Sequence, residues 1–376
     1  MTALESFRFE DDRFENGLFE PERFDLSLSE NPFPPLPSVL GALDEALATA
    51  NRYPEFRPRL LPELIAGHIG ARADQVVVGA GATGVAMQIM QTLPHRGARF
   101  VFAAPTFDGY PILAGMTGLR AAPVPLDAHG RQDLWAMSRL IDRDTGLVAI
   151  CRPHNPTGTV VSGSELKAFL CAVPAGVPVL LDEAYFEFLG ASEVLDAVEL
   201  VHRHPNVLVL RTFSKAYGLA GLRIGYAFGS PDLIRRVQRL QLPFGVPALA
   251  AAAVRASYAA EYELGERILH ITTQRELLRT RLRRAGIRVP RSSANFLYLP
   301  GADIARSLAR AGIAAKRYAD GSVRVAVGDP VADRAVVRAL TAPPRPHSRP
   351  LSTDDSHLVA LTAPYAPSAA PAPRRR

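Results

Sequence analysis

Short apolar runs recur through the first two thirds of the chain, and segments with helical spacing separate several of them. Nearly continuous apolar runs of this length are typical of strands that are buried on both faces of a parallel sheet. The predicted strands are 75–79, 99–103, 147–151, 177–182 and 207–211, and the predicted helices include 38–50, 61–69, 85–92 and 164–172. The pattern therefore predicts an α/β fold in which helices cover both faces of a mostly parallel sheet.

The pattern changes in the last third of the chain. Residues 247–285 are rich in Ala, Leu, Arg and Glu with helical spacing, which predicts a helix long enough to link two domains. Two apolar runs follow, 295–299 and 322–327, with a helical segment at 302–311 between them. We expect these segments to form a small α+β unit.

The first forty residues are aromatic and acidic, and they end in the proline-rich segment 31–37, which cannot form a central strand. We expect them to form an arm that lies over another surface. The predicted division of the chain is 1–44 for the arm and the start of the small domain, 45–240 for the large domain, 241–342 for the C-terminal small domain and 343–376 for a tail. The tail is rich in Pro, Ala and Arg and buries too little apolar surface to offset chain entropy, so we expect it to be disordered.

The charge of the chain raises the question of nucleic-acid binding. The formal net charge is +6 over 376 residues, but about half of the excess lies after residue 341, and no basic face interleaved with aromatic residues is visible before it. No apolar run approaches the roughly 18 residues of a membrane span, and the acidic N-terminus is unlike a signal peptide. We expect a cytoplasmic protein with neither nucleic acid nor membrane as a partner.

The two cysteines, Cys151 and Cys171, are too few for a disulfide framework. Neither has the CxxC spacing or the His-rich surroundings of a metal site. We interpret both as core residues and expect no metal.

The carboxyl ends of the predicted strands carry unusual residues, at the edge where open α/β sheets bind ligands. The turn at 79–84 reads Gly-Ala-Gly-Ala-Thr-Gly and matches the G-x-G-x-x-G pattern of dinucleotide-binding folds. However, no acidic residue ends the next strand, where Ala103-Ala104-Pro105 stands, so a nicotinamide dehydrogenase is the least favoured interpretation. The turn is either an anion cradle at a helix start or a tight turn without a ligand.

Polar side chains follow three other predicted strands. Asp182 ends the run 177–182, and a buried carboxylate there needs a cationic partner. Lys215 follows the next strand, Arg223 comes eight residues later, and Asn155 follows the run 147–151. A lysine just past a buried strand can form a Schiff base while neighbouring hydroxyl and guanidinium groups hold a phosphate. Together these residues predict one active site.

The order of these motifs resembles that of a known enzyme family. The matching segments are Tyr53-Pro54, 79–84, Pro105-Thr106-Phe107, Asn155-Pro156-Thr157-Gly158, Asp182-Glu183-Ala184-Tyr185, Ser214-Lys215 and Arg223-Ile224-Gly225. In this order they resemble the fold-type I, pyridoxal-phosphate-dependent class I and II aminotransferases, and most of all the histidinol-phosphate aminotransferase group. The resemblance implies a large cofactor-binding α/β domain and a small α+β domain that the arm completes.

The resemblance also implies catalytic roles. Lys215 would bind pyridoxal phosphate as a Schiff base and then move the proton at the substrate's Cα. Asp182 would pair with the ring nitrogen, and Asn155 and Tyr185 would hydrogen-bond the phenolic oxygen of the ring. Phe107 would stack on the ring, at a position where family members often carry a larger or polar aromatic residue.

The phosphate of the cofactor would be bound by backbone and side-chain donors from several segments. These donors are the backbone of Ala82 and Thr83, the hydroxyl groups of Thr212 and Ser214, and Arg223. Tyr53 would reach the phosphate in the neighbouring subunit. The resemblance therefore implies a homodimer with shared active sites.

Two residues are candidates for binding the substrate. Arg324 matches the arginine that binds the substrate's carboxylate or phosphate, and a solvent-facing strand arginine is the alternative. Asn31 stands in Ser29-Glu30-Asn31-Pro32, which is similar to the family's loop beside the substrate, and a plain turn asparagine is the alternative.

The chain departs from the histidinol-phosphate enzymes at two places. Lys316 and Arg317 stand where those enzymes carry a second phosphate-binding arginine, and lysine does not bind anions bidentately. Phe19 and Phe24 stand in place of an early tyrosine. An ordinary or unusual α-amino acid is therefore at least as good a candidate substrate as histidinol phosphate.

The predicted activity is transfer of an amino group between an amino acid, or an amino-alcohol phosphate, and a 2-oxo acid by a ping-pong mechanism. A decarboxylase, lyase or cyclase that uses the same cofactor, similar to threonine-phosphate decarboxylase, is the alternative, because the protein chooses which Cα bond breaks. A cofactor-binding sensor fused to a DNA-binding domain is less favoured, because no helix-turn-helix segment precedes the α/β pattern.

Overall fold

The computed structural model describes residues 24–341. The predicted disordered tail, most of the arm and Phe19 lie outside this range, whereas Phe24 lies within it. No helix between these limits is both long and apolar enough to cross a membrane.

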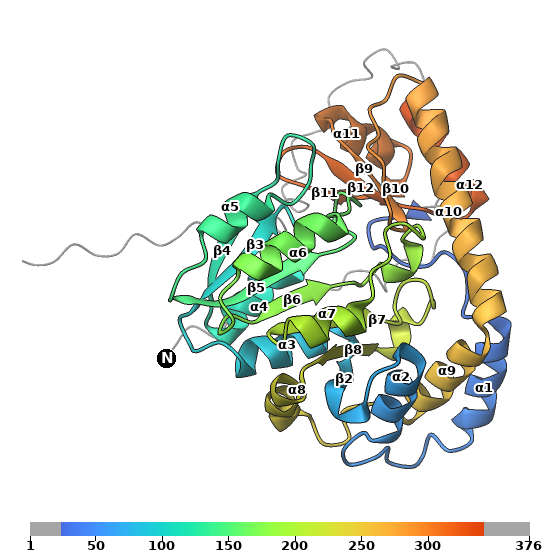
Figure 1. The fold of residues 1–376 in the computed structure, drawn as a ribbon. Coiled ribbons are helices and arrows are strands. Elements are labelled where there is room, and N and C mark those ends of the chain that lie inside the picture. Colours follow the sequence, from blue (N-terminus) through green and yellow to red (C-terminus); the bar gives the residue numbers. More distant parts are fainter. Residues whose placement is uncertain (1–23, 342–376) are drawn as a thin grey trace, which may run out of the picture.

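A seven-stranded sheet forms the centre of the larger part of the molecule (Figure 1). Its strands lie in the order β2 (Val76–Ala80), β8 (Ile224–Gly229), β7 (Val207–Thr212), β6 (Val179–Asp182), β5 (Thr145–Cys151), β3 (Arg99–Ala104) and β4 (Arg120–Pro125). The strands from β7 to β4 pair in parallel, and β8 is antiparallel to both of its neighbours. The predicted mostly parallel sheet is confirmed.

Helices cover both faces of this sheet, because alternate strand residues point to opposite sides. In β7, for example, Val207 and Val209 belong to one apolar cluster, and Leu208 and Leu210 belong to the other. The first face is covered by α1 (Pro37–Leu47), α2 (Leu60–Ile69), α5 (Leu134–Arg139), α6 (Gly163–Ala172), α7 (Ala197–Arg203) and α9 (Ala248–Ala259). The second face is covered by α3 (Gly81–Thr92), α4 (Gly109–Thr117) and α8 (Pro231–Val237).

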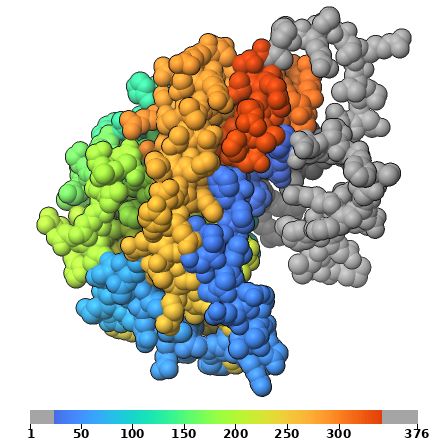
Figure 2. Space-filling view, turned by 90° about the vertical axis from the view of Figure 1, so that its right-hand side faces the viewer, coloured from blue at the N-terminus to red at the C-terminus, as the bar shows by residue number. Residues whose placement is uncertain are grey.

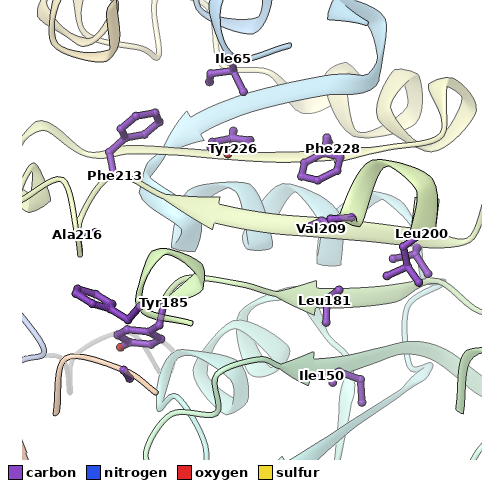
Figure 3. Close-up of a cluster of buried hydrophobic side chains, with 14 of the residues drawn as sticks. Ile65, Ile150, Leu181, Tyr185, Leu200, Val209, Phe213, Ala216, Tyr226 and Phe228 are labelled. Atoms are coloured by element: carbon purple, nitrogen blue, oxygen red, sulfur yellow. The ribbon is translucent and has the colours of Figure 1, made fainter. Parts of the chain in front are cut away.

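Figure 3 shows part of the first cluster, with Ile150, Leu181 and Val209 on three successive strands of the sheet. Leu200 of α7, beside β7, and Ile65 of α2, beside β2, belong to the same cluster. Burying a side chain of this size contributes about 1.5–3 kcal/mol relative to leaving it exposed. The two clusters therefore hold the strand ends, and the polar residues that follow them, in a fixed arrangement.

A second, smaller unit contains the C-terminal elements and the N-terminal strand. Its antiparallel sheet has the order β11 (Lys316–Arg317), β12 (Val323–Ala326) and β9 (Phe296–Leu299), and it carries α11 (Ala302–Arg310) and α12 (Pro330–Thr341). Strand β1 (Phe24–Asp25) pairs in parallel with β10 (Ile313–Ala314), so the arm joins this unit as predicted. The long helix α10 (Glu261–Arg284), gold in Figure 2, has α12, in red, beside its upper part.

The structure differs from the sequence predictions at several elements. The helix predicted over 247–285 is wrong as one element, because it is interrupted at Ala260 between α9 and α10. The apolar pattern also missed β4 and β8. Strand β4 lies at the sheet edge and buries only Val124, and β8 directly follows the Gly-Leu-Arg turn that holds Arg223.

Two further predictions concern single positions and a boundary. Cys151 is buried as predicted, but the core prediction for Cys171 is wrong, because it lies on the exposed side of α6. The boundary predicted after residue 44 falls inside α1, whose Val39 belongs to the cluster of the large sheet.

Candidate active site

The predicted site residues meet where the central strands end. Asp182, the last residue of β6, pairs with Cys151 at the end of β5. Thr212, the last residue of β7, pairs with Gly225 of β8, which in turn pairs with Gly79 of β2. The polar segments that follow these strands therefore lie along one edge of the sheet, where α/β folds bind ligands.

Asp182 is buried, and each of its two carboxylate oxygens accepts one hydrogen bond. The Tyr110 hydroxyl donates to Oδ2 at 2.6 Å, and the backbone N–H of Ala184 donates to Oδ1 at 3.0 Å. Burial raises the pKa of Asp182, and these two hydrogen bonds oppose the rise because they favour the ionised carboxylate. Phe107 packs edge-on against the Tyr110 ring, with 5.7 Å between the ring centroids.

Lys215 lies opposite the N-terminal segment that carries Ser29. Its Nζ donates to the carbonyl oxygen of Ser29 at 2.9 Å and to Oγ of Ser29 at 3.0 Å. Burial, together with the nearby Arg324 charge, lowers the pKa of Lys215 to about 8. The hydroxyl of Tyr185 lies 2.7 Å from Oγ of Ser29, so amine, serine and phenol form a connected group.

The start of α3 has the features of an anion cradle. Within residues 24–341, no side chain caps this helix, so the N–H groups of Ala82 and Thr83 in its first turn are available to a ligand. The guanidinium of Arg223 lies against the helix start, where Nη2 donates to the carbonyl oxygen of Ala80 at 3.4 Å. Gly81 has a φ of 71°, a left-handed conformation that favours glycine, and a Cβ atom built on it would lie 2.2 Å from this Nη2.

Strand β8 and the end of β7 complete the cradle. A Cβ atom on Gly225 would lie 2.2 Å from the backbone nitrogen of Ala82, which shows how closely β8 approaches the helix start. Thr212 Oγ1 donates to Ser214 Oγ at 3.0 Å, so the two hydroxyl groups are neighbours. The cradle thus combines backbone N–H groups, hydroxyls and one guanidinium.

Arg324 reaches the site from β12 of the small sheet. Its Nη1 donates to Oδ1 of Asn155 at 2.6 Å, and its Nη2 donates to the carbonyl oxygen of Ser27 at 2.7 Å. The side chain is 6% exposed, and its buried Nε has no hydrogen-bond partner in the part of the chain that the structure describes. The solvent-facing alternative for Arg324 is therefore wrong.

Three other residues have contacts that bear on their predicted roles. The Asn31 amide donates to the carbonyl oxygens of Lys215 at 3.1 Å and Ala216 at 2.9 Å. Lys316 forms an ion pair with Asp108, which follows Phe107 directly. Tyr53 lies away from the other site residues: it is 84% exposed, and its ring packs 4.9 Å from that of Phe244.

The sequence predictions missed two residues of this site. Tyr110 lies in the first turn of α4, and nothing in its surroundings along the chain distinguishes it from a core tyrosine. Ser29 lies two residues before Asn31 in the segment that resembles the substrate loop, and that proximity was the only signal for it. Among residues 24–341, no group of three or more His, Cys, Asp and Glu side chains could hold a metal ion.

Comparison with known proteins places this geometry in a family. The model of the family "Aminotransferase class I and II" matches residues 21–340. The chain is 43% identical to the aromatic amino acid aminotransferase of Cutibacterium acnes, over 83% of this chain and 90% of that protein. It is 40% identical to the enzyme of the same name from Rhodococcus jostii, over 86% of this chain and 90% of that protein.

Solved structures agree with this likeness. The histidinol-phosphate aminotransferase of Sinorhizobium meliloti, solved in complex with pyridoxal 5'-phosphate, superimposes with a TM-score of 0.79 at 27% identity. The match covers 85% of this chain and 90% of that one, and it confirms the resemblance to the histidinol-phosphate group. The chain therefore belongs to the class I and II aminotransferases, which are enzymes that work with pyridoxal phosphate.

Proposed function

We propose that this aminotransferase takes the amino group from an aromatic amino acid, and that Lys215 is the residue that binds its cofactor. The observation that supports the assignment of Lys215 is its position, because one sheet edge brings together its amine, the Asp182 carboxylate and the anion cradle. The substrate class is supported by the relatives from C. acnes and R. jostii, both named aromatic amino acid aminotransferases.

The residues present fit pyridoxal phosphate. Its phosphate needs several hydrogen-bond donors and a cation, and the start of α3 with Arg223, Thr212 and Ser214 offers both. Glycine at positions 81 and 225 leaves room there that a side chain would fill. An amine and a buried carboxylate complete the donor and acceptor set that this cofactor requires.

Lys215 would perform two tasks. When bound, pyridoxal phosphate withdraws electrons from the substrate's Cα and carries the amino group between the two half-reactions. Lys215 holds the cofactor and, once released, acts as the base that moves the proton at Cα. Because burial lowers its pKa to about 8, a substantial share of its amine is neutral near pH 8 and can act as nucleophile or base.

The residues around Lys215 would orient the cofactor. Asp182 keeps the ring nitrogen protonated, and Tyr110 and Ala184 hold its carboxylate in place. Asn155 and Tyr185 would donate hydrogen bonds to the phenolic oxygen of the ring. Phe107 would lie against the ring and exclude water from that side.

Arg324 would bind the substrate's carboxylate. Its guanidinium is buried and already oriented by Asn155 and Ser27, and its Nε is free to donate to an anion. A planar guanidinium binds a carboxylate bidentately, which fixes the position of Cα. The Asn31 amide is engaged with the backbone of Lys215, so we assign it to positioning the lysine loop.

The part of the site around Lys316 and Tyr318 favours a substrate without a phosphate. Asp108 neutralises the charge of Lys316. Lys316 therefore attracts an anionic substrate side chain much less than an unpaired lysine would. Tyr318, whose pKa burial raises, lies near Arg324 and Tyr185. The aromatic ring of Tyr318 is better suited to contact an aromatic substrate side chain than a phosphate group.

We also propose a homodimer in which Tyr53 reaches the partner's phosphate. Tyr53, Phe56 and Phe244 form an aromatic group that is 84%, 58% and 42% exposed, respectively. An exposed apolar group of this kind marks an interaction surface. Within each subunit, residues 45–240 would bind the cofactor, and residues 241–342 with the arm would close over the substrate.

An absorption spectrum of the purified protein tests the cofactor and substrate assignments together. The wild-type protein should show a visible band that disappears on adding phenylalanine, tyrosine or tryptophan, with one 2-oxo acid formed per cofactor. The Lys215→Ala variant should not cycle under the same conditions. A band that responds to aspartate or histidinol phosphate but to none of the aromatic amino acids would refute the substrate class.

A further inference from the structure

Ser29 makes the hydrogen bonds that hold the Lys215 amine. Its carbonyl oxygen and its Oγ accept from Nζ at 2.9 and 3.0 Å, respectively. Ser29 is 4% exposed, so water does not compete strongly for these contacts. The position of the amine is therefore set by a residue 186 positions away in the N-terminal segment.

The segment around Ser29 is fixed from both sides. The Asn31 amide donates to the carbonyl oxygens of Lys215 and Ala216, which ties the segment to the lysine loop. The Asn295 amide donates to the carbonyl oxygens of Ser29 at 3.3 Å and Glu30 at 3.0 Å, which ties it to the residue before β9. Ser29 is thus held in place independently of its contact with the amine.

The hydroxyl of Ser29 also contacts the phenol of Tyr185, at 2.7 Å. A serine hydroxyl can accept one hydrogen bond while it donates another. Tyr185 has a single proton, and the proposed function directs it to the phenolic oxygen of the cofactor. Ser29 then donates to Tyr185 and accepts from the Lys215 amine. In this arrangement Ser29 couples the proton positions of the phenol and the amine.

Transamination requires the lysine amine to be released while the substrate's amine is bound, and then to move a proton at Cα. A free lysine side chain has many accessible rotamers, so an unheld amine would spend much of its time out of reach. The charged groups that face Lys215 are Arg324, Glu30, Asp182 and Arg223. Within residues 24–341, no side chain of these four residues forms a hydrogen bond with the Lys215 amine, whereas Ser29 does. Ser29 is therefore the residue that holds the amine in place.

We propose that Ser29 is a catalytic residue that receives the released amine of Lys215, holds it within reach of the substrate's Cα and links it to the phenol of Tyr185. The proposal rests on the proposed function, because it takes Lys215 as the lysine that binds the cofactor.

The test compares Ser29→Ala with a buried serine elsewhere. Ser257 of α9 is 0% exposed, and its hydroxyl donates to the carbonyl oxygen of Ala253 at 2.7 Å, so Ser257→Ala removes a buried hydroxyl without touching the site. Each loaded protein is mixed with phenylalanine or its Cα-deuterated form, and the loss of the visible band is followed in a stopped-flow instrument. The pH midpoint of the band is measured separately.

Ser29→Ala should keep the band but convert it at least about tenfold more slowly, with a larger deuterium isotope effect, because proton transfer becomes limiting. The pH midpoint of its band should also shift, whereas Ser257→Ala should match the wild type in all readouts. An unchanged rate, or a slower rate with the isotope effect and pH midpoint of the wild type, would overturn the assignment. A wild-type protein without the band would instead refute the proposed function itself.

Discussion

Arg324 on β12 donates a hydrogen bond of 2.6 Å to Oδ1 of Asn155, in the loop after β5 and 169 residues away. The residue predicted to bind the substrate thus contacts a residue predicted to bind the cofactor. The bond joins the small antiparallel sheet to the carboxyl end of the large one, so the two ligand sites form one continuous group. It also fixes the guanidinium before a substrate carboxylate arrives, so less side-chain entropy is lost when the substrate binds.

Replacing Arg324 should reduce catalysis strongly. Arg324→Ala removes a charged partner of the substrate carboxylate, and hydrogen bonds to charged groups contribute about 1.5–3 kcal/mol each. We expect kcat/KM for aromatic amino acids to fall about 100-fold or more, and Arg324→Lys to recover only part of it because lysine cannot bind bidentately. The exposed Arg317 on β11 provides the control: Arg317→Ala should keep the wild-type kcat/KM. Equal values for Arg324→Ala and the wild type would exclude the assigned role.

Removing the Tyr110 hydroxyl should change the pH profile. Its hydrogen bond to Asp182 favours the ionised carboxylate, so Tyr110→Phe should raise the pKa of Asp182 further. The acid limb of the kcat/KM profile should then move to higher pH by about one unit, which corresponds to a hydrogen bond of about 1.4 kcal/mol. Tyr262→Phe, at an exposed position of α10, is the matched control. An acid limb that stays in place would show that this bond does not tune Asp182.

The ion pair between Asp108 and Lys316 should influence substrate choice. Asp108→Asn leaves Lys316 without its counter-charge, so kcat/KM for histidinol phosphate should rise about fivefold to tenfold relative to that for phenylalanine. Adding Lys316→Met to this variant should abolish the gain. Asp108 makes no side-chain cap to α4 in the described part of the chain, so its loss should barely affect unfolding. If the double variant keeps the gain, Lys316 is not its cause.

His154 should make the protein sensitive to acid. It is fully buried, and burial lowers its pKa from 6.5 to about 3. The unfolded chain therefore takes up a proton near pH 6.5 that the folded protein accepts only near pH 3, so stability falls as pH drops through this window. The loss is at most about 5 kcal/mol. Urea unfolding of wild type and His154→Gln at pH 7 and pH 4.5 measures it.

Comparing the wild type with His154→Gln separates the effect of His154 from that of other buried titratable groups. Glutamine remains neutral and can keep the contact that Nδ1 of His154 makes with Thr157 at 2.9 Å. The free energy of unfolding of His154→Gln should therefore fall less between the two pH values than that of the wild type. Parallel losses in both proteins would show that other groups cause the acid sensitivity.

The sequence by itself determined most strands of the large sheet, though not β4 and β8, and most of the polar residues that meet at its edge. Asp182, Lys215 and Asn155 could be predicted to meet because each follows a buried apolar strand, and parallel strands end at one edge. The glycine-rich start of α3 was visible along the chain as well, since the left-handed φ of 71° at Gly81 favours glycine. These signals are local, because they are visible in short segments and in the order of strands and helices along the chain.

Only the tertiary structure decided which side chains touch. The contacts of Ser29 with Lys215, and of Tyr110 with Asp182, join segments that are 186 and 72 positions apart. The ion pair of Lys316 with Asp108 likewise links the small sheet to the loop after β3. No local pattern marks such residues, because their partners are set by how the two apolar faces of the sheet and the arm pack. The sequence thus determines where the chemistry gathers, and packing determines which atoms meet there.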